Sequence, residues 1–433
     1  MCLIVFDWNP TRRSYYPSFV VAANRDEVYD RPSQIAHFWK DKKPTIIYGG
    51  RDLLMGGTWL ACSTTTTSGS GRFAAVTNYH EPRKNAIGGK GKIYPRSRGE
   101  IPVMFVSEEE QQTQQQQEQQ QPSPKVNSTL TATTTTTLSE TASSSSLIEF
   151  VKTRLEICHK EYGGYNAILF DGQSLIYCTN RGGGGEGEGE RRNGGGEEEQ
   201  QQEQDQQNYS FVMKELPPGL YGLSNHLLDT PWPKVIKAKI GLSNVLSSMS
   251  SMVQDGVTKE EEEDDDDEKN TNNTMSYDCY NYYHTQIAQK LIKVMEDTTK
   301  VFDTDLLPTT LGVQEEIIRS SIFVEGPTFG TRTTTIVTYY DNKRYDGHGG
   351  CSFFDMTEKN HIIHHHHHHH HQTVLHCSSS EEEEEEESSS PLVHHQRIEI
   401  RSSSSSSSDP RRRHCRLHRD DDDGFNNEQK LRI

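Results

Sequence analysis

The sequence has little apolar content and no long hydrophobic run. Apolar residues make up 31% of the 433 residues, well below the near-half that globular domains carry. No stretch approaches the ~20 consecutive apolar residues of a membrane-spanning helix. Residues 1–20 also lack the basic region and the long apolar region of a signal peptide. We therefore expect a cytoplasmic protein whose association with membranes is at most peripheral.

The apolar deficit is concentrated in low-complexity tracts. Residues 108–146, 183–208 and 255–276 are rich in Gln, Glu, Gly, Ser, Thr or Asp, and His, Glu and Ser tracts follow residue 357. Such segments cannot bury enough apolar surface to offset chain entropy. They predict a folded domain over 1–345 with three disordered inserts, and a largely disordered tail over 346–433. The remaining roughly 270 residues suffice for one large domain or two small ones.

Cysteine spacing and charge exclude several classes of partner. The eight cysteines are scattered, and none has the C-x-x-C spacing of a zinc site or the density of a disulfide scaffold. The net charge of −18 comes largely from acidic runs inside the tracts, so it describes solvated segments and no binding face. A basic cluster at 411–419 lies beside four Asp residues, and we predict no nucleic-acid partner. We interpret the His run at 364–371 as a repeat expansion and predict no metal.

Hydrophobic periodicity predicts strand hairpins followed by helices and further strands. Apolar runs at 3–6 and 19–23 flank an Asn-Pro turn and predict a hairpin. Further strands are predicted at 45–48, 56–61, 72–77, 165–170, 174–178, 209–213, 220–223, 321–325 and 333–340. Of these, 165–170 and 174–178 are predicted to form a hairpin around Asp171 and Gly172, and 321–325 and 333–340 a last hairpin. Helical spacing predicts helices at 147–162, from Pro233 onward, and at 283–298. This order indicates an α+β fold, for which one arrangement is two antiparallel sheets packed together with helices outside.

The N-terminal segment carries the strongest candidate for chemistry. Cys2 follows Met1 directly on a predicted strand, and removal of Met1 would leave a cysteine with a free α-amine. Because thiols titrate near ~8.5 and α-amines near ~7.7–8.0, that amine could accept the thiol proton at neutral pH. Asn24, Arg25, Asp26 and Glu27 follow the second strand and could orient the amine and hold a carbonyl oxygen. The structural alternatives are a small core cysteine and a turn-capping polar cluster.

Several blocks together resemble one known family. Residues 24–27 with Arg31 and Pro32 resemble the signature of the NRDE family, which includes the transport and Golgi organisation 2 homologues. Matching blocks follow in family order at 50–52, 56–60, 71–79, 97–100, 221–225, 229–234 and 330–335. The resemblance implies an N-terminal-nucleophile (Ntn) hydrolase-like αββα sandwich, with two antiparallel sheets, helices outside and the N-terminal strand at its centre.

A more distant similarity to cysteine Ntn acylases implies site residues. These are Cys2, Asn24, Arg25, Asp26, Asn78, Asn225 and Arg332. In that comparison Cys2 attacks a carbonyl, Asp26 holds the amine, and Asn78 and Asn225 donate to the oxyanion. Arg332 binds an acidic substrate or orients Asp26. The alternative is that the asparagines and Asp26 only support turns through bonds to the backbone.

Two functions of different class follow from the resemblance. The first is a non-catalytic protein that binds a small hydrophobic ligand and so supports Golgi organisation, protein secretion and lipid or haem homeostasis. The ligand would be an acyl lipid, acyl-CoA or haem, with no cofactor required and haem as a carried ligand. The second is a cysteine Ntn-type hydrolase that cleaves amides or thioesters of acyl lipids with Cys2. The resemblance implies a cytoplasmic location with Golgi or mitochondrial association.

Overall fold

The computed structural model describes most of the chain outside the low-complexity tracts. The described residues are 2–12, 16–40, 45–64, 71–80, 94–107, 146–182, 210–260, 277–308, 312–341, 352–361 and 393–400. The predicted inserts at 108–146 and 183–208 lie outside these ranges, apart from Ser146. Of the third predicted insert, only the part up to Glu260 lies inside them.

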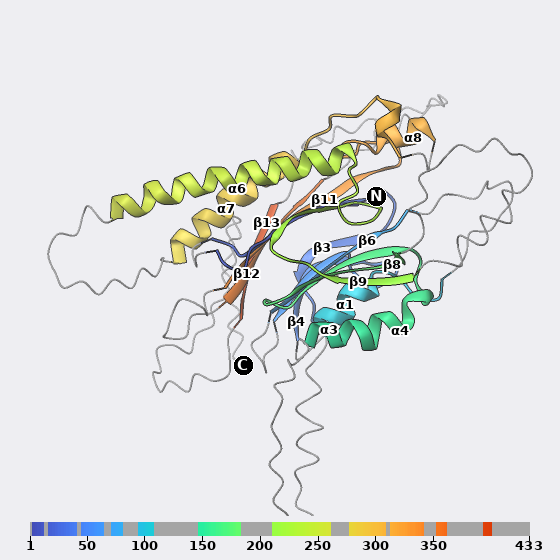
Figure 1. Cartoon of the computed structure of the whole chain (residues 1–433), viewed down its shortest axis with the longest axis horizontal. Helices are drawn as coiled ribbons and strands as arrows, with labels where there is room; N and C mark the ends of the chain where they lie inside the picture. Colours follow the sequence, from blue (N-terminus) through green and yellow to red (C-terminus); the bar gives the residue numbers. More distant parts are fainter. Residues whose placement is uncertain are drawn as a thin grey trace, which may run out of the picture.

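Two antiparallel sheets form the centre of the fold (Figure 1). Sheet A has the order β10-β1-β2-β11-β12-β13, and sheet B runs from β3 to β9 in sequence order. The strands of sheet A are β1 (Cys2–Trp8), β2 (Phe19–Val28), β10 (Gly219–Leu223), β11 (Phe329–Tyr340), β12 (Ser352–Asn360) and β13 (Val393–Ile400). Those of sheet B are β3 (Ser33–Phe38), β4 (Ile46–Asp52), β5 (Leu60–Thr64), β6 (Gly71–Asn78), β7 (Tyr165–Phe170), β8 (Leu175–Gly182) and β9 (Ser210–Glu215). The predicted α+β class is confirmed.

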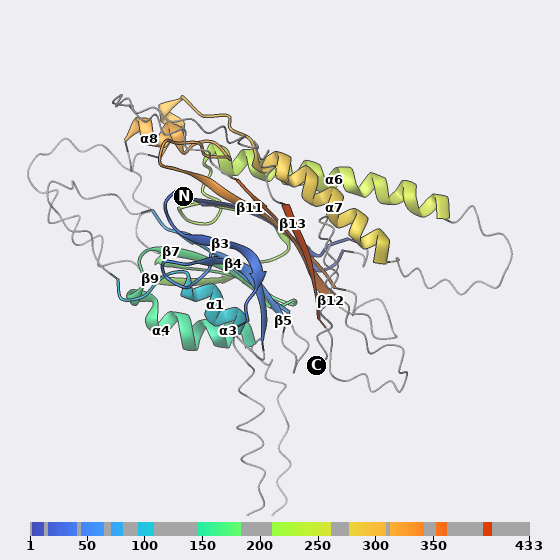
Figure 2. The ribbon, with the colours of Figure 1, turned by 180° about the vertical axis from the view of Figure 1, so that it is seen from behind.

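Helices cover the outer face of each sheet. The long helices α6 (Pro233–Glu260) and α7 (Tyr277–Met295) pack on sheet A, as Figures 1 and 2 show from opposite sides. Sheet B is covered by α1 (Glu100–Ser107), α3 (Ser146–Phe150) and α4 (Glu156–Cys158). A short helix, α8 (Val313–Ile318), lies near the start of α6. The result is four layers: helices, sheet A, sheet B and helices.

The two sheets are joined by an aromatic core. Residues of β1 alternate, so Ile4 and Phe6 enter the core between the sheets while Leu3 and Val5 pack against the helices. Across the sheets, the ring centroids of Phe19 and Phe170 lie 4.6 Å apart. Each fully buried aromatic side chain contributes about 1.5–3 kcal/mol. Strand β1, which lies between β10 and β2, therefore has apolar residues buried on both of its faces.

Several predicted elements differ in the structure. The hairpin of β1 with β2 and that of β7 with β8 are confirmed. The predicted helix over 147–162 is broken into α3, a π-helical turn, α4 and a 3-10 turn. The predicted pairing of 321–325 with 333–340 is wrong, because β11 pairs with β2 and β12 while Glu325 forms only an isolated bridge to Gly330. Strand β3 and helix α1 had no sequence signal that we recognised.

Sheet A continues past residue 345. Strands β12 and β13 come from the segment assigned to the tail. Phe354 and Met356 alternate into the core between the sheets, which gives β12 a buried apolar face. On its other face, Asp355 accepts two hydrogen bonds from Arg397 of β13, at 2.7 and 2.6 Å. The folded unit therefore includes two strands beyond the predicted boundary.

Candidate active site

Cys2 begins β1, the second strand from the edge of sheet A, and is held there through its backbone. Its amide nitrogen donates to Oδ1 of Asn225 at 3.1 Å, and its carbonyl oxygen accepts from the Ser224 hydroxyl at 2.9 Å. Both partners follow β10, which pairs with β1 in antiparallel register. The residue is half-buried. Sheet pairing and two side-chain bonds therefore fix where any nucleophile at this position would lie.

The groups around Cys2 shift the pKa of its thiol in opposite directions. Burial raises the pKa of the Cys2 thiol, and the Asp26 carboxylate raises it further. The positive amino terminus lowers that pKa, as do a hydrogen bond from the Asp26 backbone and the charge of Arg25. A buried thiol becomes a nucleophile only when a nearby base or cation offsets its desolvation. Arg25, which lies opposite Cys2 in the strand register, is the described side chain that provides such a charge.

Alternation along β2 divides the NRDE segment between two faces. Asn24 and Asp26 share the face of Val20 and Ala22, which pack on the helices. Arg25 lies opposite Cys2 in the register of the two strands and faces sheet B. The structure therefore brings Arg25 to the Cys2 side chain, while the side chains of Asn24 and Asp26 lie on the helix side.

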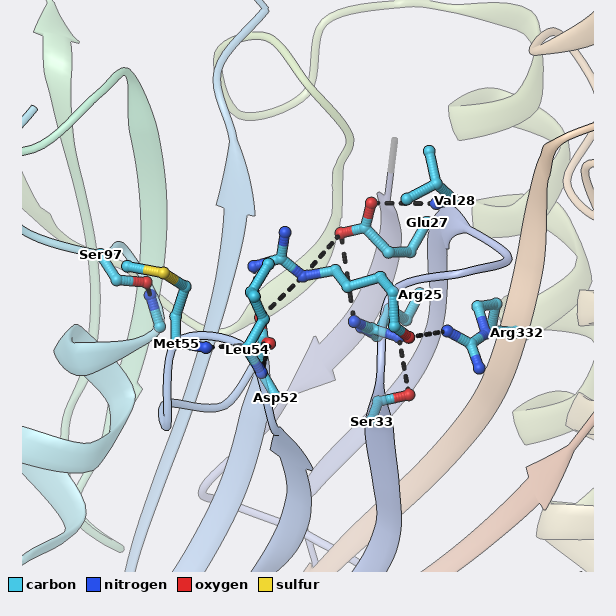
Figure 3. Close-up of polar contacts among 11 residues, drawn as sticks. Arg25, Glu27, Val28, Ser33, Asp52, Leu54, Met55, Ser97 and Arg332 are labelled. Carbon is cyan, nitrogen blue, oxygen red and sulfur yellow. Dashed lines mark hydrogen bonds and ion pairs between the residues drawn. The ribbon is translucent and has the colours of Figure 1, made fainter. Parts of the chain in front are cut away.

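Arg25 lies at the interface of the two sheets, within the polar cluster of Figure 3. Its guanidinium stacks over the Trp59 ring at 4.2 Å, bonds the Ser33 hydroxyl at 3.4 Å and pairs with Glu27 at 4.0 Å. Burial lowers the pKa of Arg25, and Glu27 and Cys2 oppose that shift. A stacked guanidinium with long polar contacts is suited to hold an anionic or carbonyl oxygen.

Asn24 connects strand β2 to the helix layer on sheet A. Its Nδ2 donates to the carbonyl oxygens of Met295 at 2.8 Å and Ile322 at 3.0 Å, and its Oδ1 accepts from the Thr334 hydroxyl at 2.8 Å. The side chain is 1% exposed. These bonds secure the end of α7 against sheet A, a positioning contact that the sequence could not show.

Asp26 is buried on the helix side of sheet A and is 3% exposed. Its Oδ1 accepts a 2.6 Å hydrogen bond from the Thr331 hydroxyl. Burial raises the pKa of the Asp26 carboxyl, and the amino terminus, Lys234 and the Thr331 bond lower it. Thr331 and Lys234 were missed by the sequence reasoning, although both lie in blocks that matched the family.

Asn225 connects Cys2 to the end of β6. While its Oδ1 accepts from Cys2, its Nδ2 donates to the Asn78 carbonyl at 2.7 Å. Asn78 is the exposed last residue of β6, and within the described part of the chain its side chain makes no recorded hydrogen bond. The structure therefore brings Cys2, Asn78 and Asn225 together, with the amide of Asn225 committed to backbone groups.

Arg332 lies at an irregularity of β11 on the outer side of this cluster. Pairing with β2 shifts register between Thr331 and Thr333, and the Arg332 guanidinium donates to the carbonyl of Arg31. Arg31 in turn binds Asp52 at 2.6 Å. The recorded hydrogen bond to the Asp26 carboxylate comes from Thr331. The positive charge of Arg332 acts on Arg25 and lowers its pKa.

Comparison with known proteins identifies the family. A sequence profile of the Transport and Golgi organisation 2 family matches residues 1–348. The chain belongs to the Transport and Golgi organisation 2 family. It is 26% identical over 348 residues to the mouse Transport and Golgi organization 2 homolog, covering 78% of this chain and 88% of that protein. The bovine and human homologs are 28% and 29% identical over 250 residues, covering 55% of this chain and 62% of each relative.

Family membership covers the Cys2 site but not the whole of sheet A. Strands β12 and β13 lie beyond the residues that the family profile matches. In the described ranges, no helix combines the length and apolar character needed to cross a bilayer.

One buried cluster has the residue types of a metal site. His284, Asp355 and His395 place ligand atoms within 4.8 Å of one another. However, Asp355 already forms a two-point ion pair with Arg397, and both ring nitrogens of His284 bond threonine hydroxyls. A divalent cation would add uncompensated charge to this buried site. We interpret the cluster as an ion pair that attaches β13 to the sheet.

Proposed function

We propose that this chain is a cysteine hydrolase that, after removal of Met1, cleaves amide or thioester bonds of acyl lipids in an Ntn-like fold. The observation that supports the proposal is the backbone clamp on Cys2 by Asn225 and Ser224, at 3.1 and 2.9 Å. The clamp holds the first residue of β1 opposite Arg25 and close to the backbone of Asp26. The sequence analysis placed ligand binding first, and we place hydrolysis first because of this clamp.

The reaction uses the two groups that a free Cys2 carries. The α-amine accepts the thiol proton as the sulfur attacks the substrate carbonyl carbon, and the carbonyl π electrons move to oxygen. The ammonium then protonates the leaving nitrogen or sulfur as its bond to carbon breaks, which leaves an acyl thioester on Cys2. Water attacks that thioester with the amine again as base, and releases the acid and the free thiol.

In this scheme, Asn78 and Arg25 stabilise the negative charge that develops on the substrate carbonyl oxygen. The donors we assign are the guanidinium of Arg25, which lies opposite Cys2 in the register of β1 and β2, and the exposed amide of Asn78, whose backbone carbonyl is bonded by the same Asn225 that bonds Cys2. Preorganised donors of this kind are typically worth about 2.7–4 kcal/mol each. Asn225 acts mainly by holding Cys2 and Asn78 together.

The test compares Cys2→Ala with Cys158→Ala, which removes a partly exposed thiol in the helix layer. Intact mass and the N-terminal peptide first establish whether Met1 has been removed. We expect the unaltered chain and Cys158→Ala to hydrolyse members of a panel of acyl amides and acyl-CoA thioesters and to form an acyl adduct on Cys2. Cys2→Ala should show neither the hydrolysis nor the acyl adduct. Retention of Met1, acetylation of the amine, or equal turnover by Cys2→Ala would refute the proposal.

A second candidate is a carrier of a hydrophobic ligand. Asp52, the ion-pair partner of Arg31, is followed by a loop of exposed apolar residues. Leu53, Leu54 and Met55 are 54, 60 and 53% exposed. The Asp52 carboxylate accepts from the backbone amides of Leu54 and Met55 and holds this loop (Figure 3). Apolar side chains next to guanidinium groups suit an acyl chain with an anionic head, such as acyl-CoA, and also suit haem.

Both candidates fit a role in Golgi organisation, secretion and lipid or haem homeostasis, in the cytoplasm or at Golgi or mitochondrial membranes. The relatives' printed names supply the Golgi link. Under the carrier hypothesis, Cys2→Ala binds fluorescent acyl-CoA or haem with unchanged affinity. Replacing Leu54 by Ser weakens binding, whereas the same change at Val393, which is 54% exposed but lies on β13, does not.

A further inference from the structure

The hydroxyl of Thr333 is buried without a partner in the described part of the chain. Thr333 lies on β11 and is 4% exposed, and its Oγ1 makes no hydrogen bond to any described residue. Every other buried threonine of this strand does bond: Thr331 to Asp26, Thr334 to Asn24, Thr335 to Glu358 and Thr338 to His284. Because buried polar side chains are nearly always paired, this exception marks a hydroxyl that is available to a ligand.

An extra residue in β11 sets Thr333 opposite Arg25. Pairing with β2 joins Thr331 to Asp26 and Thr333 to Arg25, with a register shift between Thr331 and Thr333. Uninterrupted pairing would set Arg332 opposite Arg25, so that two guanidinium groups faced each other. Bulges of this kind re-aim side chains and are common next to active sites. The irregularity therefore places a hydroxyl, in place of a second cation, beside the buried guanidinium.

The same row of paired residues leads to Cys2. Cys2 pairs with Arg25 in the register of β1 and β2, and Arg25 pairs with Thr333 in that of β2 and β11. Side chains directly opposite each other lie on one face of a sheet, which is here the face toward sheet B. Since neighbouring strands are about 4.8 Å apart, Arg25 lies about 5 Å and Thr333 about 10 Å along the row from Cys2.

Arg25 and Thr333 offer hydrogen-bond donors to an oxyanion. Arg25 is 5% exposed, and its polar contacts are long, at 3.4 Å to Ser33 and 4.0 Å to Glu27 (Figure 3). A guanidinium carries five donors and a hydroxyl one, and charge-assisted bonds from such donors to a carboxylate or phosphate are the strong ones. In the next row, the carboxyl of Glu358 already accepts from a backbone amide of sheet B at 2.7 Å.

We propose that Arg25 and Thr333 form a subsite for a carboxylate or phosphate of the substrate, about 5–10 Å from the carbonyl that Cys2 attacks. Thr333 is then a residue that determines specificity, because it distinguishes acyl compounds with an oxyanion at this distance from uncharged ones. The inference rests on the proposed function for the part that Cys2 plays, whereas binding of the oxyanion requires no turnover.

The experiment separates binding from hydrolysis by using the full chain with Cys2→Ala. The probes are octanoyl thioesters whose leaving thiols have equal length and end in a carboxylate, a phosphate or an uncharged methyl ester. We expect calorimetric titration to show at least about tenfold tighter binding of one charged probe than of the methyl ester, as for one hydrogen bond to a charged group. The charged probe that binds more tightly identifies the oxyanion.

Thr333→Val, added to the Cys2→Ala chain, removes the hydroxyl and keeps the shape of the side chain. It should weaken binding of the preferred charged probe about tenfold and leave the affinity for the methyl ester unchanged, whereas Thr333→Ser should retain the original affinities. Because the lost hydroxyl had no partner, the urea midpoint should stay the same or rise. Thr338→Val is the matched control: it removes a hydroxyl that bonds His284 at 2.8 Å, so it should lower the urea midpoint and leave all affinities unchanged.

Equal affinities for the charged and uncharged probes would overturn the inference, and this comparison needs no change at Thr333. A Thr333→Val chain that loses affinity for all three probes, or unfolds at lower urea, would overturn it too, because the hydroxyl would then have a structural role. If the preference for an oxyanion holds but the unaltered chain hydrolyses no probe, the proposed function fails and the subsite remains. Hydrolysis of all three probes with equal kcat/KM and equal affinities would remove the subsite alone.

Discussion

The buried carboxyl of Glu358 makes the stability of this fold depend on pH. Glu358 lies on β12 and is 2% exposed. It accepts from the Ala36 amide of sheet B at 2.7 Å and from the Thr335 hydroxyl of sheet A at 3.3 Å. Burial raises the pKa of Glu358 from 4.5 to about 7, although these hydrogen bonds and the charge of Arg25 oppose the shift. Glu358 thus bridges the two sheets, and its raised pKa favours the protonated carboxyl.

The sign and size of the effect follow from linkage. The folded state holds a proton on Glu358 that the unfolded state has lost between pH 4.5 and about 7, so stability falls as pH rises through this window. A shift of 2.5 units corresponds to about 3 kcal/mol at 1.36 kcal/mol per unit. About 2 kcal/mol of this lies between pH 5 and 7.5, and above pH 7.5 almost all of the contribution is lost.

The perturbation is Glu358→Gln, which keeps the shape and the acceptor oxygen but cannot titrate. We expect the free energy of unfolding of the unaltered chain, measured in urea, to fall between pH 5 and 7.5 by about 2 kcal/mol more than that of Glu358→Gln. Glu156→Gln, on an exposed residue of α4, is the control and should follow the unaltered chain. If Glu358→Gln and the unaltered chain show parallel pH dependence, the assignment of this buried proton is wrong.

Two further predictions concern buried polar contacts. Replacing Asn24 by Ala leaves the carbonyls of Met295 and Ile322 without their donor and should lower the free energy of unfolding by about 2–4 kcal/mol; a loss below about 1 kcal/mol in urea titration would contradict this role. Replacing Arg397 by Met leaves the Asp355 charge buried and unpaired and should cost about 3–5 kcal/mol. Adding Asp355→Leu should restore much of that stability, and hydrogen exchange of β12 would reveal whether β13 remains paired.

Local sequence signals predicted the β1–β2 and β7–β8 hairpins correctly, because each has its turn and its apolar strands close together in the chain. The β7–β8 turn is an example. Asp171 accepts from the amides of Gln173 and Ser174 at 3.0 and 2.8 Å, and Gly172 has a φ of +89° that glycine adopts without strain. An Asp-Gly pair between two apolar runs is therefore enough to predict this turn.

Other features depend on contacts that no local pattern contains. Both faces of β2 are buried, so its apolar run does not show which face meets the helices and which meets sheet B. For this reason the sequence placed Asn24, Arg25 and Asp26 in one site, whereas the structure separates Arg25 from the other two. Strand β13 could not be predicted from its own residues, since Arg397 is stabilised by Asp355, 42 positions earlier.

The separation of faces explains why one short segment serves both stability and chemistry. On the helix side, Asn24 uses its whole amide and Asp26 bonds Thr331, so these side chains complete the packing of sheet A. On the other side, the polar contacts of Arg25 among the described residues are long, at 3.4 and 4.0 Å. A guanidinium carries five donors, and burial without short partners leaves it able to gain from an added oxygen anion. Arg25 is therefore the residue of the motif that we expect to contact the occupant of the Cys2 site, whether that occupant is a substrate carbonyl or the head group of a carried ligand.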